Sequence, residues 1–549
     1  MVATPDPKCH TEGDISHPRI AHIAGIGLLM AISGTSLALG ASGELRVEAG
    51  GNPDFLDPAL ARDPLAWQVM GATQGGLVAF RRAGGTPGTT VVPDLATALP
   101  VVSPNGLSLT FTLRDDVRFG PPASRVALPS DVKSSLERML TLDSRGTALY
   151  TAIDGAPAVI AGRTRQLSGV VADDAARTVI ITLTRRDPSL VQALALPFAS
   201  VVPKGTRAVD QTVDPPASLG PYAISAFDPD RRIVLTPNPG YVARDGLPAG
   251  HAARITISLG YTPRAAAAHV ATGDADYSVM PIAQSATRRG GYAAGATANA
   301  ITNSATAYVA IDSSQAPFTN PVVRRAVGLA LDRTAAAAAI STGARPASRM
   351  IPPGTPGSRQ GTAAPDLRTA RALVSGAGAT GTAVTLWTGT GSAERAIAPA
   401  VRDALSKMGL APVVRAFPRN SGLGRAAPRA AIATALWSQT LPDGSDAYAQ
   451  LLGTTAPGTP ATPPVPAISG DAALRARARS AGNAVLGTGR DSAWAQVDAR
   501  AVADGRVVAV ATPVATEVTA PGVSGVTVNP VLGVLLGSLQ PAGGSDSAR

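Results

Sequence analysis

The sequence predicts an α/β protein with more than one domain. A chain of 549 residues is too long for a single ordinary hydrophobic core and suggests two or three domains. Apolar residues make up 45% of the chain, and glycine and proline are abundant, which is typical of a folded, loop-rich protein. Strand-like alternation and helix-like periodicity succeed each other along the chain, so we expect mixed sheets with helices packed on them.

The first half of the chain contains several strand–helix blocks. The clearest has Leu109, Phe111 and Leu113 alternating with polar residues, as on a half-buried strand, followed by a helix at 131–140 with Ser130 as its N-cap. The other elements expected before residue 303 are strands 44–48, 169–172, 179–183, 220–224, 232–235 and 254–259, and helices 64–79, 188–196 and 263–271.

A change of lobe is expected near residue 303. After a strand at 308–311, Asn320 and Pro321 supply the N-cap and first position of a helix at 322–331. A strand, a helix and a second strand then form a βαβ unit. The elements expected in this half are helix 366–375, the βαβ unit 384–387, 393–408 and 411–415, a surface loop at 454–467, and strands 507–511 and 514–518.

The N-terminus is expected to be a targeting segment. Lys8 and Arg19 precede an uncharged run, Ile20–Gly43, whose apolar core is followed by small residues. That order is typical of a secretory signal, with cleavage near 40–42. The run is also just long enough for an uncleaved membrane anchor. A buried core helix is the third interpretation, which the run's five glycines disfavour.

The basic charge does not indicate a nucleic-acid partner. The formal net charge is +10, but the arginines are scattered singly or in pairs, and aromatic residues make up only 4% of the chain. A nucleic-acid surface would cluster basic residues and interleave them with aromatics. We therefore expect a solvated basic surface.

The sequence supports no class of enzyme, metal site or cofactor. Cys9 is the only cysteine and precedes the apolar run, while His251 and His269 are the only histidines after it. Zinc sites need several such ligands at close spacing. Neither a Gly-x-Ser-x-Gly elbow nor a Gly-Lys-Ser/Thr phosphate loop is present. The paired acids Asp115-Asp116 and Asp173-Asp174 read as solvated turn residues rather than catalytic groups.

Five short motifs occur in one order along residues 44–540. They are Leu56-Asp-Pro-Ala59; Ser103–Asp115 with Asp131–Arg138; Gly220-Pro-Tyr222; Asn238-Pro-Gly-Tyr241; and Pro317-Phe318 with Val323–Arg333. In these motifs and their order, the chain resembles the extracellular solute-binding proteins of family 5, the peptide/nickel class of receptors that deliver ligands to ABC importers.

The resemblance implies two α/β lobes of the periplasmic-binding-protein type, joined by hinge strands, with an extra N-terminal subdomain. A small molecule or peptide would bind in the cleft between the lobes without chemical change. The partners would be ABC permease subunits, and the chain would be an exported, membrane-associated monomer. Ala41 stands where lipoprotein relatives carry a cysteine, so no lipid anchor is expected. An envelope sensor or chaperone of the same fold is the alternative, and a secreted hydrolase a remoter one.

The resemblance also gives the expected division of the chain. Residues 1–43 would be the signal or anchor and 541–549 a disordered tail. Between them, lobe I would comprise 44–78, the subdomain 79–205, 206–302 and the return strands 509–540, and lobe II would comprise 303–508.

The expected ligand-binding residues come mainly from one family motif. Peptide-binding relatives carry Trp-x-x-Asp-Tyr-x-Asp-Pro, whose first aspartate holds the peptide ammonium. The corresponding segment here begins at Trp437, and Thr440 stands at the position of that aspartate. A hydroxyl offers a weaker, neutral hydrogen bond, so the resemblance implies poor binding of free peptides unless Asp443 substitutes. Further candidates are Trp387, before a Gly/Thr loop, and Gly51 and Asn52, after the first strand. Trp67 is expected in the core.

Overall fold

The computed structural model describes residues 43–142, 145–280, 296–302, 304–341, 343–361, 364–417, 430–452 and 471–541. The expected targeting segment, the loop at 454–467 and the C-terminal tail therefore lie outside the described residues, apart from Gly43 and Pro541 at their edges. Within the described ranges, no helix is long and apolar enough to cross a membrane.

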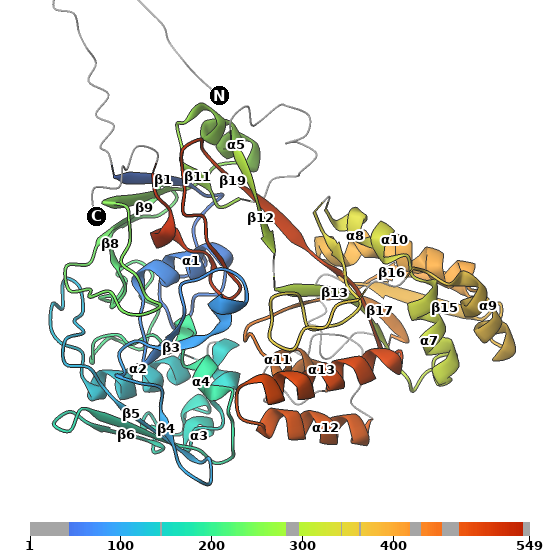
Figure 1. Cartoon of the computed structure of the whole chain (residues 1–549), viewed down its shortest axis with the longest axis horizontal. Helices are drawn as coiled ribbons and strands as arrows, with labels where there is room; N and C mark the ends of the chain where they lie inside the picture. Colours follow the sequence, from blue (N-terminus) through green and yellow to red (C-terminus); the bar gives the residue numbers. More distant parts are fainter. Residues whose placement is uncertain are drawn as a thin grey trace, which may run out of the picture. The chain divides into compact units, whose positions relative to one another are not determined.

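Lobe I is built on a seven-stranded sheet, in the order β12-β19-β11-β1-β10-β9-β8 (Figure 1). Strand β1 is parallel to both of its neighbours, β10 and β11, and the remaining pairs of the sheet are antiparallel. Leu45 and Val47 of β1 are buried in the core of this lobe, as the alternation in the sequence predicts. The strands are β1 Glu44–Glu48, β8 Tyr222–Asp228, β9 Arg232–Pro237, β10 Arg254–Ser258, β11 Tyr277–Ser278, β12 Thr297–Thr302 and β19 Val514–Thr519, and the helices are α1 Pro64–Thr73 and α5 Pro263–Thr272.

The subdomain of lobe I has its own antiparallel sheet, in the order β4-β5-β7-β6. One face packs on α2, with Phe111 and Leu136 in a shared core. The elements are β4 Val101–Val102, β5 Ser108–Thr112, α2 Pro129–Thr141, α3 Ala156–Ile160, β6 Val170–Asp173, β7 Thr178–Thr182 and α4 Leu190–Ala193. Two small hairpins complete lobe I: β2 Val78–Phe80 with β3 Val91–Pro93, and β20 Val528–Asn529 with β21 Gly533–Val534.

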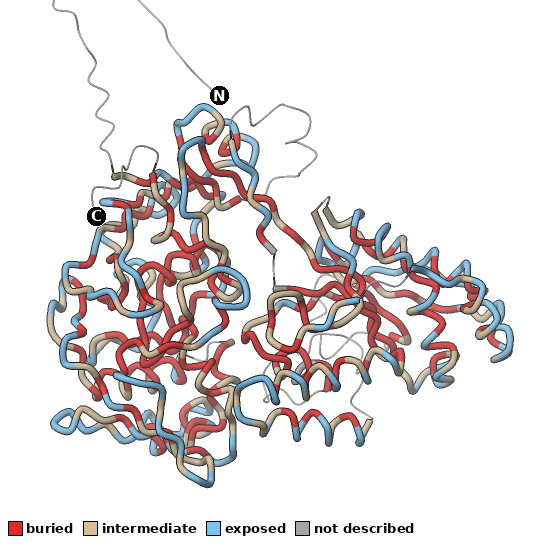
Figure 2. Tube along the Cα trace, in the orientation of Figure 1, coloured by how far each residue is buried: buried red, intermediate tan, exposed pale blue. Residues whose placement is uncertain are grey.

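Lobe II contains a six-stranded mixed sheet, in the order β14-β18-β13-β17-β15-β16. Two of its inner strands, β13 and β18, are buried along their whole length (Figure 2). The strands are β13 Ala305–Ile311, β14 Arg345–Pro346, β15 Ala383–Thr388, β16 Ala411–Ala416, β17 Ile432–Ser438 and β18 Val507–Thr512; the helices are α7 Pro321–Ala330, α8 Arg333–Ile340, α9 Leu367–Gly376, α10 Ser392–Lys407, α11 Gly444–Leu451, α12 Ala472–Asn483 and α13 Thr488–Ala503.

The chain passes between the two large sheets at two described places. It leaves the seven-stranded sheet after β12 and enters the six-stranded sheet at β13. It returns between β18 and β19, which only Pro513 separates, so a return at residue 509 would fall inside β18. Because β12 and β19 pair along six residues, the two passages run side by side (Figure 1). This strand distribution supports a division near 303 and 513, which we propose for the lobes.

Several expected elements differ from the observed ones. The helix expected at 64–79 ends at Thr73, because Gly75 and Gly76 follow and residues 78–80 form β2. The helix expected at 188–196 is reduced to a single turn, α4. Ser130 is not the N-cap of α2. The helix begins after Leu128, whose N–H donates to the Asp131 carboxylate at 2.8 Å.

Residues of the five motifs bind one another within the scaffold. Arg138 of α2 forms a buried bidentate ion pair with Asp57, which joins the first two motifs. The Asn238 amide donates to the carbonyl of Gly220 at 3.0 Å, which joins the third and fourth motifs. Within the fifth, Arg324 donates to the carbonyl of Phe318 at 2.8 Å. The motifs therefore stabilise the fold itself.

Candidate functional site

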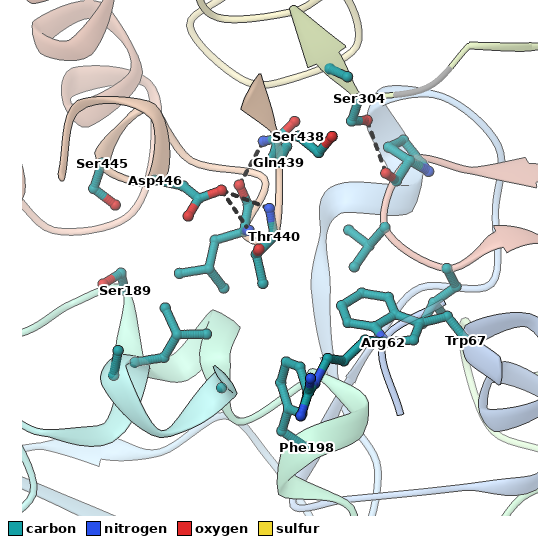
Figure 3. Close-up of a pocket in the computed structure, with 18 of the residues that line it drawn as sticks. Arg62, Trp67, Ser189, Phe198, Ser304, Ser438, Gln439, Thr440, Ser445 and Asp446 are labelled. Atoms are coloured by element: carbon teal, nitrogen blue, oxygen red, sulfur yellow. Dashed lines mark hydrogen bonds between the residues drawn. The ribbon is translucent and has the colours of Figure 1, made fainter. Parts of the chain in front are cut away.

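A cavity of about 1510 Å³ is lined by residues of both lobes (Figure 3). It is larger than the roughly 300–1,000 Å³ usual for a drug-sized ligand. Lobe I contributes the start of α1, the subdomain around α3 and α4, and the loop between β20 and β21. Lobe II contributes the end of α8, the start of α10, the end of β17, the loop after it and the first turn of α11. Ile301, Ser304 and Pro513 line it at the passages between the lobes.

Two aromatic side chains form part of the lobe I wall. The Trp67 and Phe198 rings meet edge to face, with centroids 5.7 Å apart (Figure 3). The Trp67 indole N–H donates to the carbonyl of Ala61 at 2.9 Å, which fixes the ring's orientation. Such a surface offers apolar and π contacts to a ligand without conformational adjustment.

One short stretch of chain forms much of the lobe II wall, and Ala305, Ile340, Ser392 and Ala393 line the cavity from other segments of the lobe. Leu436, Ser438, Gln439, Thr440 and Leu441 line the cavity as β17 ends and the following loop begins. The Gln439 N–H donates to the carbonyl of Ser304 at 2.7 Å, and the Ser304 hydroxyl donates to the carbonyl of Pro530 at 2.9 Å. This stretch is therefore connected through Ser304 to the loop of lobe I.

Asp446, in the first turn of α11, presents a buried carboxylate to the cavity. Its Oδ2 accepts the backbone N–H groups of Thr440 at 2.6 Å and Leu441 at 3.3 Å (Figure 3). Burial raises the pKa of Asp446 to about 7, and nearby Asp443 adds to the rise while the two backbone hydrogen bonds oppose it. The group therefore changes charge near neutral pH.

Guanidinium groups line the opposite, lobe I side of the cavity. Arg62, Arg163 and Arg185 are exposed and belong to the lining, together with the carboxylate of Asp187. Among the described residues no ion pair involves these three arginines; the guanidinium of Arg185 donates to the Thr151 hydroxyl at 3.2 Å. The two walls thus carry opposite charges once Asp446 is ionised.

The structure brings only one of the expected ligand-binding residues to this cavity. Thr440 lines it. Trp437 is 4% exposed in the lobe II core, and Trp387 stacks on Phe417 with centroids 4.9 Å apart. Neither tryptophan is part of the cavity lining.

The two candidates after the first strand also lie away from the cavity. The Asn52 amide exchanges hydrogen bonds with Asp230: its side chain donates to the carboxylate at 2.7 Å and accepts the backbone N–H at 2.8 Å. Gly51 precedes it in the same loop, with open space where a side chain would stand. A role for Gly51, Asn52, Trp387 and Trp437 in binding stays a prediction.

Asp443 is occupied by an internal partner. Its carboxylate accepts from Nε and Nη2 of Arg490 at 2.6 and 2.9 Å, and both side chains are nearly inaccessible. Arg490 also donates to the carbonyls of Ala481, Gly482 and Ala484, at the end of α12. The pair fixes α13 against α12 and the loop before α11, so Asp443 is saturated by protein donors.

Sequence reasoning missed Asp446 and placed Trp67 only in the core. Asp446 follows the family motif by several residues, and only the turn into α11 brings its carboxylate back to Thr440. Trp67 does pack against the cores of lobe I, but it also lines the cavity. In the described part of the chain, no three His, Cys, Asp or Glu side chains are grouped as metal ligands would be.

Two α/β lobes, two strand passages between them and a large cavity lined by both define a two-lobed binding protein. The family model for bacterial extracellular solute-binding proteins, family 5 (middle region), matches residues 90–459. The chain belongs to this family, as its motifs suggest.

Two curated relatives are named as probable binding proteins for small peptides. The probable di/tripeptide-binding protein 5 of Pseudomonas aeruginosa (strain UCBPP-PA14) is 30% identical over 280 residues, which is 48% of this chain and 51% of that protein. The probable D,D-dipeptide-binding periplasmic protein DdpA of Escherichia coli (strain K12) is 27% identical over 199 residues, or 35% of each. The chain thus spans about half of the first relative's length and about a third of the second's.

Solved structures confirm the two-lobed fold. The clavulanic acid biosynthesis oligopeptide binding protein 2 superposes with a TM-score of 0.79 at 22% identity, covering 91% of this chain and 95% of that one. The unliganded open form of the periplasmic murein tripeptide binding protein MppA gives a TM-score of 0.73 at 20% identity, covering 91% and 97%.

Proposed function

We propose that the protein is the exported solute-binding component of an ABC importer and that it binds a peptide or peptide-like solute in the cavity between its lobes. The observation that supports this most is the cavity itself, which is large, contacted by both lobes and furnished with charged groups at separate places. The family supports the same class of activity, since the named relatives are peptide-binding proteins.

The lining of the cavity favours binding over catalysis. Its described residues include hydroxyl, carboxylate and guanidinium groups but no histidine or cysteine. A hydrolase would place a nucleophile against a base, and the acidic groups Asp446 and Asp187 instead accept hydrogen bonds from backbone N–H groups and from the Ser189 hydroxyl, respectively. We infer that the ligand is released unchanged.

Native mass spectrometry of protein isolated from its own host tests the proposal. A co-purified solute of fixed mass is expected, together with a more compact particle in small-angle scattering when that solute is added back. A product that accumulates in proportion to the solute consumed would show that the protein is an enzyme. If the purified protein carries no bound solute and also binds no peptide in calorimetry, the receptor role is contradicted.

Ligand binding should alter the fluorescence of one particular tryptophan. Of the four tryptophans, only Trp67 lines the cavity, so a bound solute should shift or quench its emission. We expect Trp67→Phe to abolish the signal and Trp387→Phe to keep it, because Trp387 stacks on Phe417 away from the lining. Titration of both variants with the same peptide decides this. A signal that survives in Trp67→Phe and disappears in Trp387→Phe would place the ligand elsewhere.

A further inference from the structure

The cavity separates its charges between its walls. Asp446 is the only carboxylate on the described lobe II wall, whereas Arg62, Arg163 and Arg185 lie on the lobe I wall. Asp187 offsets one of these three positive charges. A ligand that meets both walls is therefore exposed to a negative site at one side and a positive field at the other.

The geometry of Asp446 suits it to receive a cation. Its Oδ2 is held by two backbone N–H groups, and among the described residues no hydrogen bond reaches its other oxygen. The side chain is mostly buried and lines the cavity, so a ligand ammonium there would form a charge-assisted hydrogen bond largely shielded from water. Asp443 cannot do the same while Arg490 occupies both of its oxygens.

The arginines suit an anionic group. Arg163 and Arg185 belong to the subdomain and Arg62 precedes α1, so they approach the cavity from separate segments of lobe I. A guanidinium binds carboxylate or phosphate through paired N–H donors. Without a carboxylate partner in the described residues, these groups retain donors for a ligand.

We propose that the cavity selects and orients a dipolar ligand, with its ammonium at Asp446 on lobe II and its carboxylate at the arginines of lobe I. This rests on the proposed function. It also revises the consequence drawn from Thr440: the ammonium site lost at that position is supplied by the carboxylate that binds the Thr440 backbone. The ligand class is a peptide or peptide-like amino acid derivative with both ends free.

Calorimetry with four forms of tetra-alanine tests both ends separately. The forms are the free peptide, the N-acetylated peptide, the C-amidated peptide and the doubly blocked peptide. In the wild type, acetylation should weaken affinity about tenfold or more, because it removes one charge-assisted hydrogen bond. In Asp446→Asn the free peptide should bind as weakly as the acetylated one. Asparagine's oxygen can still accept the two backbone N–H groups, so the loop should keep its shape.

Matched variants isolate each wall. Asp187→Asn removes a carboxylate from the same cavity without affecting Asp446, and it should preserve the effect of acetylation. The double variant Arg163→Gln/Arg185→Gln should reduce the effect of C-amidation to less than about threefold. The control is the double variant of the adjacent exposed arginines, Arg165→Gln/Arg186→Gln, which lie outside the lining. It should behave as the wild type.

Binding should also depend on pH through Asp446. Because its pKa is raised to about 7, the carboxyl is mostly neutral at acid pH and ionises as pH rises through neutrality. The other charged groups nearby are Asp443, paired with Arg490, and Asp187 and Arg185 across the cavity. We expect affinity for free tetra-alanine to rise about tenfold from about pH 5.5 to 7, below the pKa of the peptide amine. Asp446→Asn should remove this rise.

The outcomes separate this inference from the proposed function. If the wild type binds free and acetylated tetra-alanine equally well, Asp446 does not hold an ammonium, although the receptor role stands. If acetylation still weakens binding to Asp446→Asn tenfold, another acid is responsible. If amidation has no effect in the wild type, the arginine site is overturned. If no form of the peptide binds any variant while a host solute co-purifies, the ligand is not a simple dipolar peptide.

Discussion

Replacing Arg138 with methionine is expected to lower the free energy of unfolding of lobe I by about 3–5 kcal/mol. Arg138 and Asp57 form a bidentate pair with 4% and 0% of their side chains exposed. Removing the arginine leaves a carboxylate that is buried without its cation, and such a group cannot recover its hydration. The backbone N–H of Gln211, which donates to Asp57 at 3.0 Å, compensates only in part.

Urea unfolding monitored by hydrogen exchange measures this effect lobe by lobe, because a protein of this size need not unfold in one step. Arg232→Met is the matched control. Its i,i+4 pair with Asp228 is about half exposed, and such pairs contribute roughly 0–1 kcal/mol. The double variant Arg138→Met/Asp57→Leu should lose less unfolding free energy than the sum of the two single variants, because removing both partners together leaves no isolated buried charge. A loss below about 1 kcal/mol for Arg138→Met would contradict this account.

The second large effect is expected at Arg490. Replacing it with methionine removes the cation from Asp443 and three donors from the end of α12, so the free energy of unfolding of lobe II should fall by about 3–5 kcal/mol. Both side chains are at most 4% exposed, so water cannot substitute. Hydrogen exchange of α12 and α13 should report the loss, while that of α2 in lobe I should stay unchanged.

Arg490→Met also distinguishes support of the site from contact with the ligand. The loop between β17 and α11 contains Asp443 and shapes the surroundings of Thr440 and Asp446. Loosening of this loop should weaken the binding of free and of acetylated tetra-alanine by similar factors. A variant that loses only the preference for a free amine would instead show that Asp443 takes part in ammonium recognition. Arg500→Met is the control, because the Arg500 side chain is exposed and its only ion-pair partner in the described residues is Asp504, just after the end of the same helix.

Local signals predicted much of the fold. The N-cap of α7 at Asn320 is confirmed, with its side chain accepting the N–H of Val322, because Asn followed by Pro is a strong and purely local signal. The strands expected at 169–172 and 179–183 are confirmed as β6 and β7, which pair antiparallel across the turn after Asp173. Errors arose where tertiary contacts decide. The predicted N-cap of α2 is wrong: the helix begins after Leu128, whose N–H donates to the Asp131 carboxylate, and the same carboxylate also accepts the N–H of Lys204, a contact far along the chain.

The candidate site was much harder to predict than the fold. Thr440 was found because it occupies a motif position, and it does line the cavity. Asp446 has no motif, and its importance depends on a turn that brings its carboxylate to the backbone of Thr440. Trp437 begins the family motif and Trp387 precedes a Gly/Thr loop, but only the packing of the lobe II core shows which way these side chains face. Sequence periodicity carries no such information.

The lobe II wall has a further consequence for how such a receptor acquires a new cargo. A single stretch, 436–446, supplies Thr440, Asp446 and five other lobe II residues that line the cavity. The motif pairs that secure the scaffold, such as Asp57 with Arg138, lie elsewhere in the chain. The Asp57–Arg138 pair and the lobe II contacts to the cavity are therefore encoded in separate stretches of the gene, although 436–446 also contains Asp443, whose pair with Arg490 supports lobe II. Exchanging Thr440, Asp446 and their neighbours between relatives, with Asp443 kept for its pair with Arg490, is a compact route to altered selectivity, both in natural divergence and in the engineering of biosensors.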